Sequence, residues 1–190
     1  MIISVISKKG GVGKTPFAFS IAKDLNMYLQ SNDNSCIEHI YPNKAKISQE
    51  VKLIDNCVYD FGGFVAKGIL NIVEKSNYVI IPTNPNLNSI IRTYETYNEL
   101  KEFNKNFIIL ATGFKDNKEV AFLIKNLKKI KDCNIPIFYF KDSKIVLNSM
   151  NYGKSFNELY KENTLSMHSY KNFIKSYYEL LKYIKNNKLF

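Results

Sequence analysis

The sequence has no tryptophan, only two histidines and three cysteines, and no long apolar run. His39 and His168 are far apart, and Cys36, Cys57 and Cys133 form neither a CxxC pair nor a His/Cys cluster. This spacing excludes a recognisable zinc motif and a disulfide framework. We therefore expect the cysteines to be buried thiols in a reducing cytoplasm.

Nothing in the chain approaches the roughly 20 consecutive apolar residues that a membrane-spanning helix needs. The first apolar stretch is interrupted at once by Lys8 and Lys9, so it is not a signal peptide. Leu189 and Phe190, at the end, leave a membrane contact open as the less favoured alternative. We expect a cytoplasmic protein without a membrane role.

Positive charge dominates, with 27 Lys and Arg against 17 Asp and Glu and a formal net charge of +10. Arg92 is the single arginine among many Lys, Asn, Ile and Tyr residues, a composition that indicates A+T-rich coding. Two interpretations stay open. The lysines either form an ordinary solvated surface or bind DNA without sequence preference.

Short apolar runs alternate with longer amphipathic stretches along the whole chain. This rhythm predicts one α/β domain over residues 1–190, with a mainly parallel sheet and helices on both faces. Most of the runs are unbroken, as expected for strands that are covered on both sides. The predicted strands are Ile2–Ser7, Ser35–Ile40, Cys57–Asp60, Tyr78–Pro82, Phe107–Thr112 and Pro136–Phe140.

Helical periodicity marks the segments between these strands. In the first of them, Phe19, Ala22, Leu25 and Leu29 recur at helical spacing. The last segment is amphipathic and should dock on the sheet. The predicted helices are Thr15–Gln30, Val65–Glu74, Ser89–Phe103, Lys118–Lys131 and Ser169–Asn186.

A glycine-rich segment, Lys8-Lys9-Gly10-Gly11-Val12-Gly13-Lys14-Thr15, joins the first strand to the first helix. This is the context of a phosphate-binding loop. Glycines let the backbone N–H groups turn toward an anion, and the helix N-terminus adds partial positive charge. Lys14 would reach the β- and γ-phosphates, and Thr15 would offer a hydroxyl to Mg²⁺.

The usual phosphate loop begins with glycine, but Lys8 stands at that position and the segment reads KGGVGKT. It resembles the deviant Walker A ATPases of the ParA/MinD type. The resemblance implies a P-loop NTPase fold, ATP or ADP with Mg²⁺, and a dimer in which Lys9 reaches the partner's nucleotide. It assigns catalytic roles to Lys9, Lys14 and Asp60, Mg²⁺ to Thr15 and Asp60, and nucleotide binding to Gly10, Gly11, Val12, Gly13, Lys14, Thr15, Pro16 and Pro82.

Weaker similarities to the same family follow along the chain. Val58-Tyr59-Asp60-Phe61-Gly62-Gly63 resembles its second acidic motif, with Asp60 near Mg²⁺ and the glycines sensing the γ-phosphate, although Asp60 could instead cap a turn. Val79–Pro85 is similar to the strand and proline-containing loop beside the nucleotide. Leu110–Gly113 occupies the place of a base-contacting loop, and Asp142-Ser143 and Gly153-Lys154-Ser155 are lesser matches.

Two departures from the family pattern bear on activity. The aspartate that positions the attacking water corresponds to Tyr41, in Tyr41-Pro42-Asn43, which predicts weak or absent hydrolysis unless Glu38 or Asp55 replaces it. Pro16 lacks the N–H that would contact the α-phosphate, while still fitting a first helical turn.

Within the family, the chain most resembles the small plasmid-partition ParA proteins. The resemblance implies an ATP-dependent dimer that segregates a plasmid or similar cargo with a centromere-binding partner, and possible nonspecific DNA binding. One alternative is a degenerate P-loop adaptor or dimerisation protein without ATPase activity. A ligase of the dethiobiotin-synthetase type shares the fold, but such enzymes generally lack the second lysine, Lys9.

Overall fold

The computed structural model describes residues 1–62 and 68–186. In these ranges the chain forms a seven-stranded sheet with the order β3-β2-β4-β1-β5-β6-β7, and every neighbouring pair is parallel. The strands are β1 (Ile2–Ile6), β2 (Tyr28–Ser31), β3 (Ala45–Ile47), β4 (Cys57–Phe61), β5 (Tyr78–Thr83), β6 (Phe107–Phe114) and β7 (Ile137–Lys141).

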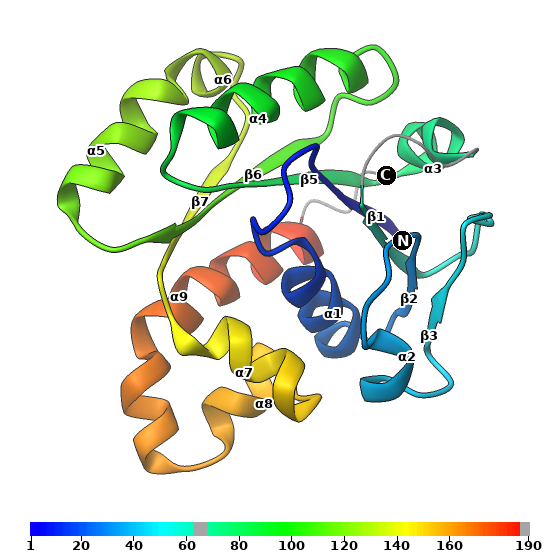
Figure 1. Ribbon diagram of the computed structural model, residues 1–190, viewed down its shortest axis with the longest axis vertical. Coiled ribbons are helices and arrows are strands. Elements are labelled where there is room, and N and C mark those ends of the chain that lie inside the picture. The colour runs from blue at the N-terminus through cyan, green and yellow to red at the C-terminus, as the bar shows by residue number, and fades with distance from the viewer. Residues whose placement is uncertain (63–67, 187–190) are drawn as a thin grey trace.

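Helices cover both faces of the sheet (Figure 1). α3 to α6 lie on one face, and α1, α2 and α7 to α9 lie on the other. The helices are α1 (Lys14–Asp24), α2 (Ile37–Ile40), α3 (Ile69–Lys75), α4 (Leu87–Leu100), α5 (Asn117–Asn126), α6 (Lys128–Asp132), α7 (Lys144–Tyr152), α8 (Phe156–Lys161) and α9 (Thr164–Asn186). The predicted fold class is confirmed.

Alternating side chains of the strands enter two separate cores. In β1, Ile3 and Val5 pack with α1 and α9, whereas Ile2 and Ile6 pack with α3 and α4. All five residues of β1 are buried, because a parallel sheet of this kind has helices on both faces. The unbroken apolar runs seen in the sequence have this cause.

Five of the six predicted strands are present, with ends shifted by one or two residues, as β1, β4, β5, β6 and β7. The helix predicted over Ser89–Phe103 corresponds to α4, and the C-terminal one to α9, which starts earlier, at Thr164, and contacts β7. The prediction for Lys118–Lys131 merged two helices, α5 and α6, which are separated at Leu127. Of the helix predicted over Val65–Glu74, residues 65–67 lie outside the described ranges.

The prediction of one long helix over Thr15–Gln30 is wrong, because α1 ends at Asp24. Asn26 adopts a left-handed conformation with φ 55°, which asparagine tolerates and which commonly ends a helix. The Met27 N–H then donates to the Ala22 carbonyl at 2.8 Å. Leu29 continues the apolar spacing of the helix but lies in β2.

The strand predicted over Ser35–Ile40 is also wrong. The second strand is Tyr28–Ser31, and Ile37–Ile40 forms the short helix α2, in which Ile37 is the buried residue. The segment between Asn43 and Cys57 contributes the edge strand β3. Because the second strand is Tyr28–Ser31, the loop at its C-terminal end consists of other residues than predicted, beginning with Asn32 and Asp33.

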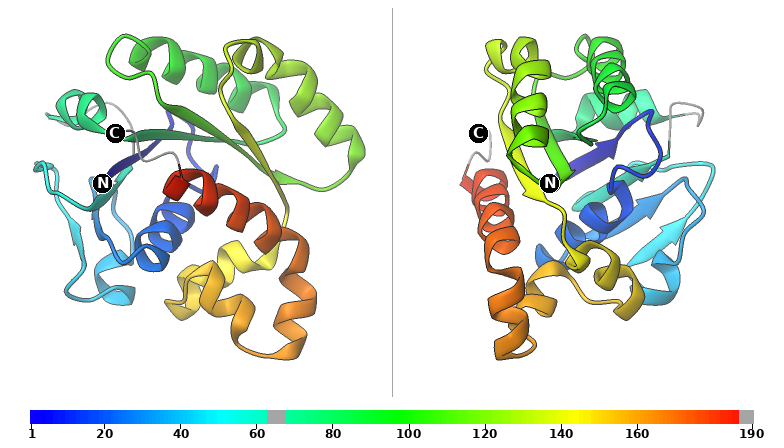
Figure 2. Two further views of the ribbon diagram at one scale, coloured as in Figure 1. Left: turned by 180° about the vertical axis from the view of Figure 1, so that it is seen from behind. Right: turned by 60° about the vertical axis from the view of Figure 1, so that its left-hand side comes forward.

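α1 is anchored at its far end to the two C-terminal helices, which lie beside it in Figure 2. Asp24 accepts hydrogen bonds from the Ser155 hydroxyl (2.6 Å) and the Tyr177 hydroxyl (2.8 Å). Burial raises the pKa of Asp24, and these two hydrogen bonds partly oppose the rise. Closer to the start of α1, Phe17 packs against Phe156 and Phe173. A polar and an aromatic cluster together fix α1 against α8 and α9.

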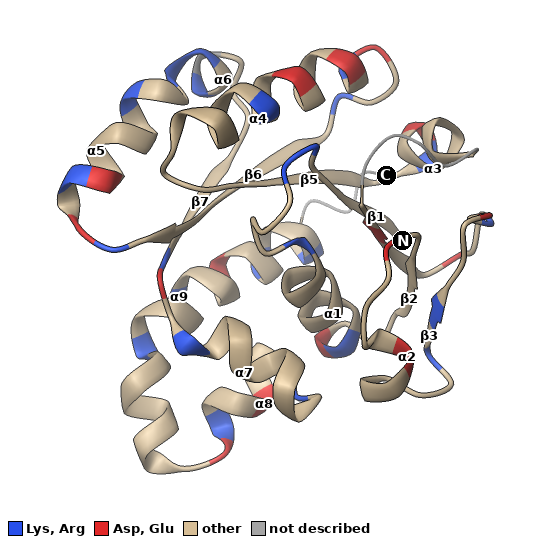
Figure 3. Cartoon of the chain, viewed as in Figure 1, with Lys and Arg blue, Asp and Glu red and all other residues tan. Residues whose placement is uncertain are grey.

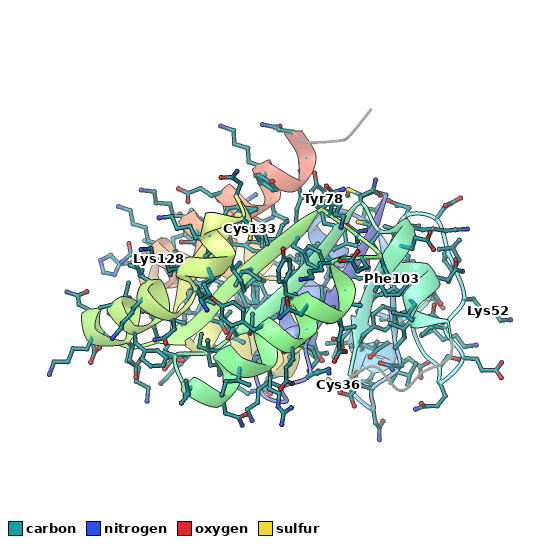
Figure 4. The ribbon with its side chains drawn as sticks, turned by 90° about the horizontal axis from the view of Figure 1, so that it is seen from above. Cys36, Lys52, Tyr78, Phe103, Lys128 and Cys133 are labelled. Carbon is teal, nitrogen blue, oxygen red and sulfur yellow. The ribbon has the colours of Figure 1, made fainter. Side chains whose placement is uncertain are left out.

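The surface bears on three of the expectations. No helix within residues 1–62 and 68–186 is both long and apolar enough to cross a membrane. Cys57 is buried as predicted, but Cys36 and Cys133 are exposed and lie well apart in Figure 4. Basic residues are spread over helices on both sides of the sheet (Figure 3), so charge alone singles out no one surface.

Candidate nucleotide site

The glycine-rich segment forms a tight loop between β1 and α1, at the C-terminal edge of the sheet. Gly11 and Gly13 have positive φ angles of 74° and 89°, which a residue with a side chain adopts only at a cost. Gly13 is the N-cap residue of α1, and Lys14 is its first helical residue. The loop therefore delivers the unpaired N–H groups of a helix N-terminus to one point, which is the arrangement that binds phosphates.

The two lysines of the loop are placed differently. Lys14 is only 8% exposed, and its ammonium group donates to the Lys9 carbonyl oxygen at 3.3 Å, so it lies across the inside of the loop. The Lys9 side chain is partly exposed and makes no ion pair within the described ranges. Lys8, by contrast, pairs with Glu99 of α4, and its N–H donates to the Thr96 hydroxyl.

Thr15, the second residue of α1, contacts Asp60 at the end of the glycine-rich loop. The Thr15 hydroxyl donates to Asp60 Oδ2 at 2.7 Å. Asp60 is fully buried, and its other carboxylate oxygen, Oδ1, has no hydrogen-bond partner in the described part of the chain. Burial raises the pKa of Asp60 to about 6, and the nearby Asp33 carboxylate adds to the rise, while Thr15 and Lys14 oppose it.

This pair suits a hard divalent cation. An unpartnered, buried carboxylate oxygen is costly, and Mg²⁺ prefers oxygen ligands, usually one or two from the protein with water or phosphate oxygens completing the shell. The Thr15 oxygen keeps lone pairs for a cation while its hydroxyl donates a hydrogen bond to Asp60. Thr15 and Asp60 therefore fit Mg²⁺ held together with a nucleotide phosphate.

The loop after β2 brings a second carboxylate, Asp33, to the same edge of the sheet. Ser31 ends β2 and is the register partner of Asp60 in the neighbouring strand. The Gly62 N–H donates to Asn32 Oδ1 at 2.8 Å, and the Asp33 side chain packs against Gly62. The sequence did not point to Asp33, because the helical apolar spacing of α1 continues into β2 and hides the end of that strand. Gly63 lies outside the described residues.

Tyr41 does not occupy the position that the sequence analysis gave it. It is 9% exposed, packs edge-on against Phe19, and donates its hydroxyl to the Met27 carbonyl, just before β2 begins and so at the opposite end of the sheet from the loop. The residues that follow the second strand are Asn32 and Asp33. A carboxylate, that of Asp33, therefore follows the observed second strand, whereas the predicted second strand was followed by Tyr41.

The two proposed replacements for that carboxylate are also elsewhere. Glu38 lies in α2, where it accepts a hydrogen bond from the N–H of Ile47 at 2.9 Å. Asp55 is an exposed residue two positions before β4 begins, at the N-terminal edge of the sheet. Neither residue is brought to the glycine-rich loop.

A cavity of ≈ 380 Å³ opens beside the loop. Its walls come from the loop, from the ends of β5, β6 and β7, and from α1, α7 and α9. The segments Thr112–Gly113 and Asp142–Ser143, both selected in the sequence, line it together. The lining residues are Gly11, Val12, Gly13, Phe17, Asn84, Thr112, Gly113, Lys115, Phe140, Lys141, Asp142, Ser143, Val146 and Phe173.

Pro82 lies inside β5, where it is buried and pairs with Leu110 of β6. Its missing N–H is tolerated because the ladder to β1 already ends at Ile80. The residue that reaches the loop is Asn84, whose amide donates to the Gly11 carbonyl at 3.4 Å. Asn84, and not Pro82, is among the cavity residues.

Pro16 is the third residue of α1. A proline there is compatible with the helix, because the N–H groups of the first turn have no partner within the helix. Because proline has no backbone N–H, Pro16 leaves the first turn of α1 with one fewer hydrogen-bond donor. Gly153-Lys154-Ser155, the remaining match, lies instead at the far end of α1, where Ser155 caps α8 with a capping box.

The chain resembles known proteins in its fold but has no match in sequence comparisons. No family model matches the chain, and no curated protein matches it. Solved structures do match over nearly the whole chain. An ATP complex of a Cyanothece McdA variant has a TM-score of 0.71 and 14% identity, covering 100% of this chain and 97% of that chain.

Two further structures give the same result. A plasmid partition protein from Borrelia burgdorferi, bound to AMPPNP, has a TM-score of 0.64 and 15% identity, covering 94% of this chain and 98% of that one. The septum site-determining protein MinD from Pyrococcus horikoshii, complexed with Mg-ADP, has a TM-score of 0.61 and 13% identity, covering 94% and 95%. The chain therefore has the P-loop ATPase fold that McdA, MinD and ParA-like plasmid partition proteins share.

Proposed function

We propose that the chain is a single ParA-like nucleotide-binding domain that binds Mg-ATP and acts as a nucleotide-dependent switch. One observation carries the proposal: Lys14 lies buried across a loop of left-handed glycines, directly beside the Thr15–Asp60 pair. A positive group, a set of free N–H donors and a buried carboxylate with a free oxygen are what a Mg²⁺-bound polyphosphate requires.

Each residue of the site has a distinct role in this proposal. The N–H groups of Gly10 to Gly13 receive the phosphates, and Lys14 neutralises the β- and γ-phosphates. Thr15 and Asp60 hold Mg²⁺, which neutralises phosphate charge when it is bound. The cavity lined by Thr112, Gly113 and Ser143 has room for the base.

Asp33 is the candidate for orienting the attacking water. It follows the second strand, the place where the ParA/MinD family carries this aspartate, and it lies close enough to Asp60 for their charges to interact. The expectation of weak hydrolysis rested on Tyr41 standing in place of this aspartate. Tyr41 lies at the opposite end of the sheet from the loop, so that expectation loses its basis. We infer that turnover depends on Asp33.

Dimerisation and cargo partitioning belong to the same proposal. The ammonium group of Lys9, free of ion pairs within residues 1–62 and 68–186, is available to reach the nucleotide of a second copy. A plasmid partition protein that shares the fold supports a role in partitioning, and a MinC:MinD complex that also shares it supports a partner protein. DNA is a further candidate partner through exposed lysines such as Lys144, Lys171 and Lys175.

Calorimetric titration with Mg-ATP tests the proposal. Lys14→Ala should abolish binding, because the polyphosphate loses its buried counter-charge. Lys23→Ala is the matched control: Lys23 lies at the other end of α1 and pairs with Glu158, so this variant should bind Mg-ATP as wild type does. Equal affinity of wild type and Lys14→Ala, or no binding by wild type, would contradict the proposal.

A further inference from the structure

The Ser31 hydroxyl, at the end of β2, lies between the Asp60 carboxylate and the backbone of Asp33. We propose that Ser31 is a positioning residue whose hydroxyl couples the Asp60 carboxylate to the backbone of Asp33. The inference rests on the proposed function for the roles of Asp33 and Asp60. It goes further by assigning a role to a side chain that belongs to neither the phosphate loop nor the cavity.

The Ser31 hydroxyl is completely buried between the ends of β2 and β4. Its oxygen accepts the N–H of Asp33 at 3.0 Å. The same oxygen lies 3.0 Å from the Asp60 carbonyl oxygen and 3.3 Å from Asp60 Oδ2. A third acceptor, the carbonyl oxygen of Asp33, is also 3.3 Å away.

A hydroxyl has one proton, so it satisfies one of these acceptors at a time. While the Asp60 carboxylate carries its charge without a cation, Oδ2 is the strongest acceptor within reach. Once that charge is neutralised, the nearer carbonyl oxygen becomes the better one. When the hydroxyl rotates to give its proton to another acceptor, the lone pair that accepts the Asp33 N–H rotates with it. A change in the charge of Asp60 therefore changes the hydrogen bond of the Asp33 N–H.

A second connection holds the same loop without involving Asp60. The hydrogen bond from the Gly62 N–H to Asn32 Oδ1 ties the backbone after β4 to the side chain after β2. It fixes where the loop lies, but it contains no group that responds to charge. Among the hydrogen bonds of this loop within the described residues, the one between the Ser31 hydroxyl and Oδ2 is the one that includes the Asp60 side chain.

Amide hydrogen exchange of Asp33 in the nucleotide-free protein tests the link itself. Ser31→Ala removes the acceptor of the Asp33 N–H, so that amide should exchange about tenfold faster, and Ser31→Thr should restore slow exchange. Ser4→Ala is the matched control. Ser4, in β1, is also fully buried, and its hydroxyl pairs with the Ser76 hydroxyl at 2.8 Å. Its loss should leave the exchange rate of the Asp33 amide unchanged.

The coupling to Asp60 is tested by a double-mutant cycle on the same amide. Asp60→Asn removes the charge and should change the exchange rate of Asp33 when Ser31 is present, but not in Ser31→Ala. Additive effects in the double variant would overturn the inference, as would an Asp33 amide indifferent to Ser31→Ala. Neither comparison requires nucleotide, so both hold even if the proposed function fails.

Mg²⁺ and a nonhydrolysable ATP analogue extend the test to the proposed function. Wild type should bind the analogue with slower exchange at Asp33. Ser31→Ala should bind it with affinity within about threefold of wild type but without that slowing, because no phosphate contact is lost. A full response in Ser31→Ala would overturn the inference. Absence of binding in wild type would overturn the proposed function alone.

Discussion

The Asp33 side chain occupies the space that a side chain on Gly62 would need. A Cβ atom built on Gly62 would lie 2.8 Å from Asp33 Cβ, Cγ and Oδ2, closer than such atoms approach in folded proteins. Glycine at this position thus allows the two loops, one after β2 and one after β4, to touch.

Gly62→Ala should therefore displace Asp33. We expect a loss of stability of about 1–3 kcal/mol from overpacking, together with reduced ATP turnover. In an Asp33→Gly background, the stability cost of Gly62→Ala should be smaller, because the clashing atoms are gone. Chemical denaturation of the four proteins measures this interaction, and equal costs in both backgrounds would show that the contact is absent.

Asp33→Ala should reduce steady-state ATP turnover by at least about 100-fold if Asp33 orients the attacking water. Nucleotide affinity should change little. Tyr41→Phe is the comparison: it removes the hydroxyl that bonds to the Met27 carbonyl, costs about 1 kcal/mol of stability, and should leave turnover intact. The assignment is wrong if the two variants turn over ATP at the same rate.

Asp60 should make the stability of the nucleotide-free protein pH dependent. Its pKa is raised from 3.8 to about 6 by burial, so the folded state holds the proton more tightly than the unfolded state. The stability that the neutral group contributes is full below pH 3.8 and is lost as the pH rises through 6. The loss is on the order of 3 kcal/mol.

Asp60→Asn should remove this dependence between about pH 4 and pH 6. The same variant should lose the Mg²⁺-dependent part of ATP binding at every pH, whereas wild type should lose it only as the pH falls below about 6. Denaturation and calorimetry over this range make the comparison. A wild-type protein with Mg²⁺-dependent affinity unchanged at pH 5 would argue against a role for Asp60.

Lys9→Ala should weaken dimerisation while leaving nucleotide binding by the monomer largely intact, since Lys9 is proposed to act across the interface. Light scattering with a nonhydrolysable ATP analogue gives the oligomeric state. Lys52→Ala serves as a control, because Lys52 lies at one edge of the molecule (Figure 4) and is exposed. A wild-type protein that stays monomeric with the analogue would rule out the dimer.

Pro16→Thr should raise nucleotide affinity, because it adds an N–H and a hydroxyl at the third residue of α1. A hydrogen bond to a charged group contributes about 1.5–3 kcal/mol, so we expect a gain of about tenfold or more. Pro42 is an exposed proline outside the site, so Pro42→Thr should leave nucleotide affinity unchanged. Lower affinity in Pro16→Thr would mean that the loop is built around proline.

The sequence predicted the fold well where its signals were redundant. β1, the glycine-rich loop and the start of α1 are marked by an apolar run, glycines and a following helical period, and all lie where expected. The central strands were found for the same reason: an unbroken apolar run flanked by polar turns has few other solutions.

The prediction failed where two patterns overlapped. The apolar spacing from Phe19 to Leu29 continues through the end of α1 into β2, and one residue, Asn26, breaks it through a left-handed conformation. Asparagine marks this position less clearly than glycine would. That single boundary displaced the predicted second strand, so that the predicted strand was followed by Tyr41, whereas the observed strand β2 is followed by Asn32 and Asp33.

The hydrogen bonds that Ser155 and Tyr177 donate to Asp24 have a consequence for synthesis of the chain. The ribosome makes α1 well before α9, since Tyr177 is 153 residues beyond Asp24. Until α9 has emerged, Asp24 stays solvated and α1 lacks both the hydrogen bond from Tyr177 and the apolar packing that α9 supplies. A nascent chain stalled before Tyr177 should therefore carry the glycine-rich loop on an α1 that is incompletely packed, so that nucleotide binding begins only after α9 has been made.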